Sequence, residues 1–179
     1  MEAVRTNLRI RLGGGETLQE MELALEQKLR EGESLLVRGH SGAAIYLMGY
    51  AVEMTLKTAY FRYRGASPAD PMPPMFAPAV HFARVRFPGI ASPGGPPFRH
   101  YHDILFWGRL LRAVHRADMR NWPPEFDSQY LNAIRLLGRM WFVEMRYKPD
   151  LADAVQARII QVKARWMARH RSLLSRKGL

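Results

Sequence analysis

The chain has 179 residues, of which 47% are apolar and 24% charged, values that fit one globular domain with a sizeable core. It contains no cysteine, which excludes disulfides, thiolate nucleophiles and zinc sites built on thiolates. Its 27 basic and 16 acidic side chains give a net charge of +11, so nucleic acid is the first partner to consider and a membrane surface the second. The alternative is that the charge serves solubility alone.

The N-terminal residues differ in pattern from the other segments. Arginines interrupt every apolar run there, so no signal peptide is predicted and we expect a cytoplasmic protein. Leu8, Ile10 and Leu12 alternate with arginines, which favours a short strand with one basic face, and the glycines at 13–15 separate this strand from the first helix. We predict an N-terminal arm over residues 1–16, which either pairs with another chain or is a frayed terminus.

Two helices joined by a short turn are predicted next. Thr17 is a good N-cap for the first helix, and Glu20 lies three residues later, as in a capping box. Gly39 suits the left-handed position that ends this helix, and Ser41 then caps a second helix over residues 41–64. A turn this short predicts an antiparallel hairpin.

The second helix is the centre of the predicted fold, because apolar side chains occupy nearly every side of it. Gly49 would let a neighbouring helix approach closely. Glu53 and Lys57 are one turn apart and can pair, and charged groups this deep need partners. They form either a structural ion pair with neighbours such as Arg146 and Tyr147, or a pocket that binds a nucleotide or a partner's side chain.

Residues 65–99 hold nine of the twelve prolines. This density predicts a long loop, with at most a short regular piece around residues 79–87. Aromatic and basic side chains alternate in its middle, a pattern that suits single-stranded nucleic acid. The alternative is that the aromatic rings hold the loop against the bundle. The side chains concerned are Phe76, Phe82, Phe87, His81, Arg84 and Arg86.

Three further helices complete the prediction. The third follows His102 and Asp103, either of which could cap it, and the fourth has Pro123 and Pro124 in its first turn. Asp150 is expected to cap the last helix. The predicted apolar side of that helix consists of Leu151, Val155, Ile159, Val162, Trp166 and Leu173. The fold class is therefore an all-α, antiparallel up-and-down bundle of about five helices over residues 17–179, with 65–99 as a loop insertion.

The last helix carries the densest basic run in the chain, of which part suits the negative end of the helix dipole. We predict that nucleic acid binds this helix and the basic part of the proline-rich loop. The predicted binding residues are Arg158, Lys163, Arg169, Arg171, Arg176, Arg84 and Arg86.

Three pieces of the sequence resemble the bacterial branch of the HEPN family (higher eukaryotes and prokaryotes nucleotide-binding domains). They are GYAVE at 49–53 followed by Leu56 and Lys57, the pair His102-Asp103, and WFVEMRY at 141–147. The resemblance covers roughly residues 17–175 and implies a helical bundle that usually dimerises through helix faces. It also implies RNA cleavage, or partnership with nucleotidyltransferases, in toxin–antitoxin and defence systems.

Ribonuclease members of that family carry an arginine, then four to six residues, then a histidine. Arg165 with His170 matches this spacing, and so does Arg109 with His115. In metal-independent cleavage, histidine would act as general acid or base and arginine would stabilise the phosphorane. The resemblance thus implies Arg165 and His170 as the catalytic pair, with His102 and His115 in reserve.

Two features of the sequence depart from that pattern. The residue after each arginine, Trp166 or Leu110, is apolar where active members usually have a polar one. Five helical steps also put Arg165 and His170 about 140° apart around a regular helix. They would converge only through a helix irregularity or across a dimer, and His170 could instead be a packing histidine on the apolar side.

The sequence contains no phosphate-cradling glycine loop, no nucleophile elbow and no paired-histidine metalloprotease motif. His100 and His102 have no further ligand motif beside them, so we propose no metal, and we expect no cofactor. We expect an RNA-directed protein of a bacterial defence or toxin–antitoxin system, which binds RNA and, if catalytic, cleaves it weakly without metal. The alternative is a non-catalytic interaction subunit of a larger nucleotidyltransferase or nucleic-acid effector assembly. The expected partners are RNA and either a second copy of the chain or another protein, with no membrane.

Overall fold

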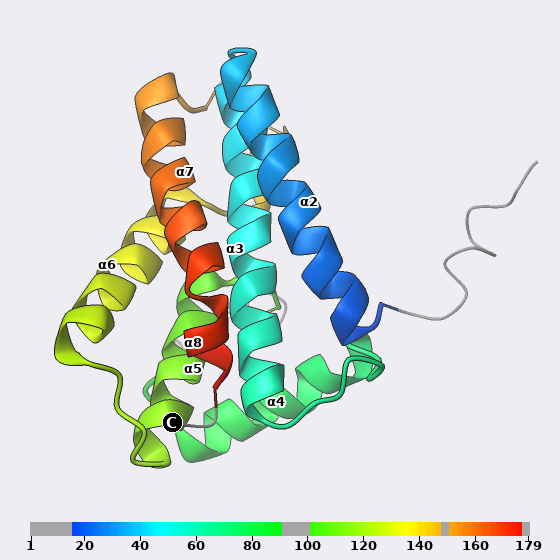
Figure 1. Ribbon diagram of the computed structural model, residues 1–179, viewed down its shortest axis with the longest axis vertical. Helices are drawn as coiled ribbons and strands as arrows, with labels where there is room; N and C mark the ends of the chain where they lie inside the picture. The colour runs from blue at the N-terminus through cyan, green and yellow to red at the C-terminus, as the bar shows by residue number, and fades with distance from the viewer. Residues whose placement is uncertain (1–15, 91–100, 148–150, 177–179) are drawn as a thin grey trace, which may run out of the picture.

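The computed structural model describes residues 16–90, 101–147 and 151–176, and these form the predicted all-α bundle (Figure 1). The elements are α2 (Leu18–Val37), α3 (Ser41–Tyr63), α4 (Pro73–Arg86), α5 (Ile104–Ala117), α6 (Pro124–Met140), the 3-10 helix η2 (Val143–Tyr147), α7 (Ala154–Arg169) and α8 (Arg171–Ser175). None of the described helices combines the length and the apolarity needed to cross a membrane. The strand predicted within the N-terminal arm lies outside the described residues.

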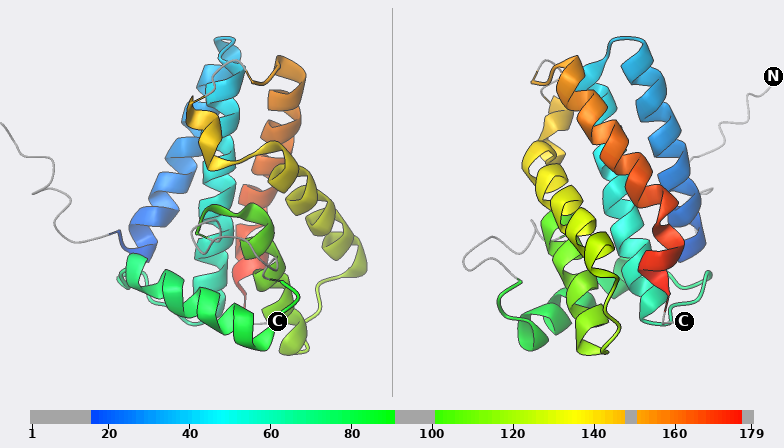
Figure 2. Two further views of the ribbon diagram at one scale, coloured as in Figure 1. Left: turned by 180° about the vertical axis from the view of Figure 1, so that it is seen from behind. Right: turned by 60° about the vertical axis from the view of Figure 1, so that its left-hand side comes forward.

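Helices α2 and α3 form the predicted antiparallel hairpin (Figures 1 and 2). The capping box is confirmed, because the Glu20 amide donates to Thr17 Oγ1 at 3.2 Å and the Thr17 amide donates to Glu20 Oε2 at 2.8 Å. Gly39 has a φ of 84°, as the turn requires. The prediction for Ser41 is wrong: it is the first helical residue of α3, and His40 precedes it without a side-chain cap.

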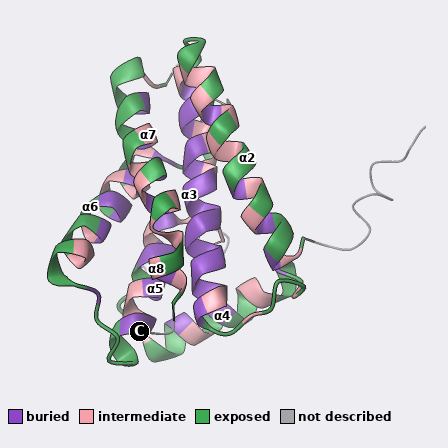
Figure 3. Ribbon diagram, viewed as in Figure 1, coloured by how far each residue is buried: buried purple, intermediate pink, exposed green. Residues whose placement is uncertain are grey.

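Helix α3 lies in the middle of the bundle and is buried along most of its length (Figure 3). The neighbour that Gly49 admits is an aromatic ring and not a helix backbone. A Cβ atom at Gly49 would overlap Trp141 Cδ1, and the Trp141 indole donates to the carbonyl oxygen of Tyr46 at 3.0 Å. The absence of a side chain at Gly49 therefore leaves room for the Trp141 ring, which holds the segment after α6 against α3.

Much of the predicted proline-rich loop is helical, which corrects that prediction. Helix α4 begins at Pro73, six residues before the short piece expected there, and crosses the lower end of the bundle (Figures 1 and 2). Prolines are tolerated in its first turn because the amides of that turn have no partner within the helix, and only Pro78 costs an interior hydrogen bond. Phe76 packs against Phe61 and Trp107, with ring centroids 5.9 and 6.0 Å apart, so this ring does hold the segment against the bundle.

The last helix differs from the prediction in its cap and in its buried face. Asp153 caps α7 in a capping box with Gln156, whereas Asp150 lies outside the described residues. The buried residues are Ala157, Ile160, Ala164 and Met167. The four predicted core residues Leu151, Val155, Ile159 and Val162 are instead 51%, 67%, 38% and 61% exposed. The buried face combines two alanines with Ile160 and Met167, so packing against α3, and not side-chain size, decides which apolar side of α7 is covered.

Candidate functional site

A buried carboxylate joined to an exposed histidine is the most distinctive polar feature of the bundle. The Glu53 side chain, on α3, is 1% exposed and accepts a hydrogen bond from Lys57 Nζ one turn further on. His102, just before α5, places Nδ1 at 3.2 Å from both Glu53 oxygens. The His102 side chain is 42% exposed. The bundle thus links a fully buried acid to its surface through one imidazole.

Lys57 contacts Glu53 and two aromatic rings inside the bundle, so its role in this cluster is structural. Its ammonium group lies 4.5 Å from the centre of the Phe76 ring on α4 and 5.6 Å from the Trp107 ring on α5. Aromatic faces attract a desolvated cation, so these rings stabilise the charge that Glu53 neutralises. The pair therefore has ring partners where the sequence suggested Arg146 and Tyr147, whose side chains lie outside the described part of the structure.

The Glu53 carboxylate determines which nitrogen of His102 carries a proton. An ionised carboxylate only accepts hydrogen bonds, so His102 Nδ1 must be the donor, and the neutral ring keeps a lone pair on Nε2. A second group that holds an imidazole in this tautomer is the arrangement that general-base histidines use. His102 Nε2 is thereby the nitrogen that can accept a proton, on a side chain that is 42% exposed.

Two tyrosines lie beside His102 on the outer side of α3. The Tyr50 ring centroid is 6.4 Å from that of His102, and Tyr46 stacks on Tyr50 with an interplanar angle of 6°. Burial, and then the Glu53 charge, raises the pKa of Tyr50 to about 12, so its hydroxyl stays protonated at neutral pH. Both rings are half-buried. We call Tyr46, Tyr50, Glu53 and His102 the His102 face.

Arg165 and His170 contact different parts of the bundle. Arg165 Nε donates to Glu33 on α2. His170 lies at the junction of α7 and α8, where Nδ1 is 2.8 Å from the carbonyl oxygen of Trp166. The His170 ring packs at a tilt against Trp166, with ring centroids 4.4 Å apart. The helix irregularity that convergence would need is present at His170, but the two side chains share no described contact. His170 has the surroundings of a packing histidine, and catalysis by this pair stays a prediction.

Most of the predicted nucleic-acid residues are exposed, but Arg171 is bound to another helix and Lys163 is half-buried. Arg171 donates to Glu26 on α2 at 3.1 Å, so part of the basic run attaches α7 and α8 to the acidic helix α2. Arg158, Arg169 and Arg176 are exposed on α7 and beyond α8, whereas Lys163 is half-buried. Arg84 and Arg86 are exposed in the last turn of α4, away from α7 at the end of the bundle (Figure 1).

His115, the other reserve histidine, serves as an internal link. It is 3% exposed, and its Nε2 lies 2.9 Å from the carbonyl oxygen of Leu174 on α8. Its ring packs 4.0 Å from Tyr63 and 4.6 Å from Trp122. Burial lowers the pKa of His115, and the neighbouring carbonyls of Leu174 and Arg120 offset this only in part. His115 therefore holds the C-terminal turn on α5 as a neutral ring.

The spacing of Glu53 and Lys57 predicted their pairing, but nothing in the sequence joined His102 to the acid, because His102 and Glu53 lie 49 residues apart. Tyr46 and Tyr50 were expected only as part of the apolar surface of the second helix. Within the described residues there is no cluster of three or more potential metal ligands. No protein-family model, curated protein or solved structure matches the chain, so the resemblance to the HEPN family remains an expectation from the sequence.

Proposed function

We propose that this protein acts on single-stranded RNA at the His102 face, as an HEPN-like protein of a bacterial defence or toxin–antitoxin system. The observation that carries the proposal is the hydrogen bond between His102 Nδ1 and the buried Glu53 carboxylate. The adjoining rings of Tyr46 and Tyr50 provide faces on which unstacked bases can pack. The net charge of +11 favours the approach of a polyanion to any part of this surface.

The chemistry would be metal-independent transesterification. His102 Nε2 takes the proton of a ribose 2′-hydroxyl while that oxygen forms a bond to the adjacent phosphorus. The bond from phosphorus to the 5′-oxygen breaks, and the leaving oxygen takes a proton from the acid form of a side chain or from water. The products are a 2′,3′-cyclic phosphate and a 5′-hydroxyl end, and no oxidant or cofactor is consumed.

The test is cleavage of a mixed single-stranded RNA pool by purified protein in EDTA. We expect the wild type to cleave and His102→Ala to lose about 10²–10⁴-fold in rate, the usual contribution of a general base. His40→Ala is the matched control, because His40 is also an exposed histidine but lies in the turn between α2 and α3. If the wild type and His102→Ala cleave RNA equally well and His170→Ala does not, the catalytic site lies at the C-terminal end of α7 and not at His102. Absence of cleavage, with RNA binding that weakens as salt rises, would leave binding without catalysis.

A second candidate is the non-catalytic interaction subunit, and the exposed apolar side of α7 favours it. Val155, Ile159 and Val162 recur at helical spacing opposite the buried face. At 100° per residue, Arg158 lies on one side of this stripe and Lys163 on the other. Such a surface fits a partner helix that carries apolar residues between acidic ones. Association of that kind persists in high salt, whereas binding through phosphates does not.

A further inference from the structure

An arginine-rich pocket lies where α5 ends and α6 begins, apart from the His102 face. It has a volume of about 190 Å³ and is lined by Arg112, His115, Arg116, Arg120, Asn121, Trp122, Pro124 and Asp127. His102 precedes the first turn of α5, whereas Arg116 is in the last turn, and fourteen helical residues span about 20 Å. The two features therefore occupy opposite ends of one helix.

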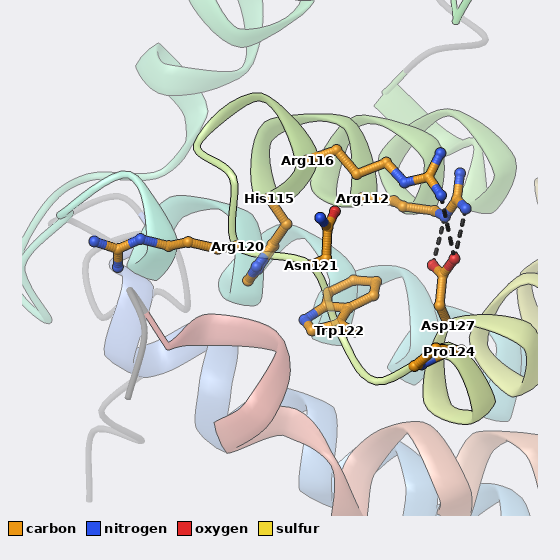
Figure 4. Close-up of a pocket in the computed structure, with 8 residues that line it drawn as sticks. All are labelled: Arg112, His115, Arg116, Arg120, Asn121, Trp122, Pro124 and Asp127. Carbon is orange, nitrogen blue, oxygen red and sulfur yellow. Dashed lines mark hydrogen bonds and ion pairs between the residues drawn. The ribbon is translucent and has the colours of Figure 1, made fainter.

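Two guanidinium groups converge on one carboxylate in this pocket (Figure 4). Arg112 binds Asp127 with two hydrogen bonds, from Nε at 2.5 Å and from Nη2 at 2.6 Å. Arg116 Nη2 lies 3.7 Å from the same carboxylate and its side chain is 58% exposed. Asn121 also lines the pocket and is drawn between His115 and the two guanidinium groups, whereas Arg120 extends on the far side of His115 (Figure 4).

The charges of the pocket do not balance. Three arginines and one aspartate line the pocket, although only Arg112 and Arg116 contact Asp127. Arg112 lowers the pKa of Asp127, so the carboxylate is ionised at neutral pH. His115 is neutral there, because burial lowers its pKa. Two positive charges remain in excess, and the guanidinium N–H groups that Asp127 does not use are free to donate to another anion.

We propose that this pocket binds a phosphomonoester group, held by Arg116, by the free N–H groups of Arg112 and by the Asn121 amide. A phosphomonoester carries a charge of about −1.5 to −2 at neutral pH, which matches the excess. Its oxygens accept hydrogen bonds from the paired N–H groups of a guanidinium. The pocket is smaller than the roughly 300–1,000 Å³ of sites that enclose a whole small molecule, so the phosphate enters while the rest of the ligand stays outside.

The phosphate could belong to the end of an RNA chain or to a free mononucleotide, and calorimetric titrations separate these sources. The titrants are inorganic phosphate, AMP, and one short RNA made with either a 5′-phosphate or a 5′-hydroxyl. If the pocket takes an RNA end, the 5′-phosphate strengthens RNA binding in the wild type but not in Arg116→Gln. If it takes a free nucleotide, AMP binds and the two RNAs do not differ.

Arg116→Gln should weaken phosphate binding about tenfold or more, because a charge-assisted contact is lost. Arg109→Gln is the matched control, since Arg109 is an exposed arginine on the same helix and outside the pocket, and it should change the affinity less than twofold. Asp127→Asn should tighten phosphate binding, because it removes the competing carboxylate. Circular dichroism checks that each variant is folded.

Equal phosphate affinity in the wild type, Arg116→Gln and Arg109→Gln would overturn the proposal. So would weaker binding by a folded Asp127→Asn variant, and so would the absence of phosphate binding by the wild type. The result is independent of the function proposed for His102, because His102→Ala should bind phosphate like the wild type. Cleavage and phosphate binding can therefore fail separately.

Discussion

Helices α3 and α7 are both rich in apolar residues, yet they occupy opposite environments. Helix α3 is buried on nearly every side and includes the ion pair of Glu53 and Lys57. Helix α7 buries a face that includes two alanines and exposes three branched side chains, Val155, Ile159 and Val162. Apolar content therefore identifies α3 as a core helix but does not identify the buried face of α7.

The largest expected effect is the loss of one partner from the buried pair in α3. Lys57→Met should lower the free energy of unfolding by about 3–5 kcal/mol, because Glu53 would remain a buried charge without its ammonium. Denaturant unfolding measures this loss. The double variant Glu53→Gln with Lys57→Met should be more stable than the single one, and an equal or greater loss in the double variant would contradict the argument.

Adjacent isoleucines in α7 provide a matched test of the buried face. Ile160 is fully buried, so Ile160→Ala should cost about 2–5 kcal/mol through lost burial and a residual cavity. Ile159 is 38% exposed, so Ile159→Ala should lower the free energy of unfolding by well under half as much as Ile160→Ala. The measurement is the difference in unfolding free energy between the two variants. Equal losses would mean that the stripe on α7 is covered in solution.

A smaller effect is expected at the contact between α3 and the segment after α6. Gly49→Ala should destabilise the protein by about 1–3 kcal/mol, because the added methyl overlaps the Trp141 ring. Gly89→Ala is a useful control, since a Cβ atom there meets no atom within 4 Å. Thermal unfolding of the two variants tests this. A neutral Gly49→Ala variant would show that the Trp141 ring can move away at little cost.

The smallest expected effect concerns pH and the attachment of α8 to α5. Folding lowers the pKa of His115 from its usual 6.5, so the unfolded chain takes up this proton first as pH falls. The contribution of His115 to stability is therefore complete above pH 6.5 and is lost progressively below it. Unfolding free energies at pH 7 and pH 5 should differ less in His115→Gln than in the wild type. If the difference between pH 7 and pH 5 is the same in His115→Gln as in the wild type, His115 is not the source of the pH dependence.

Features that depend on residues close in the chain were predictable from the sequence. The capping box at Thr17, the turn at Gly39 and the buried character of α3 all follow from spacings of a few residues. For α5 the sequence left His102 and Asp103 as alternative caps, and the structure shows Asp103. Local hydrogen bonds and helical periodicity produce these features, so they are the same wherever the helix lies.

Contacts between side chains from distant segments were not predictable in this way, because they depend on how the helices pack. The bond from His102 to Glu53 and the gathering of Arg112, Arg116 and Asp127 each depend on how two segments pack together. The buried face of α7 was predicted wrongly for the same reason, because apolar residues lie on two sides of this helix and only its packing against α3 decides which side is covered. Helix α4 likewise formed through a proline-rich stretch because its apolar residues, among them Ala79, Val80 and Ala83, pack on the bundle. Helix propensity and periodicity are properties of one helix, whereas the face that a helix buries depends on the side chains of the neighbouring helices.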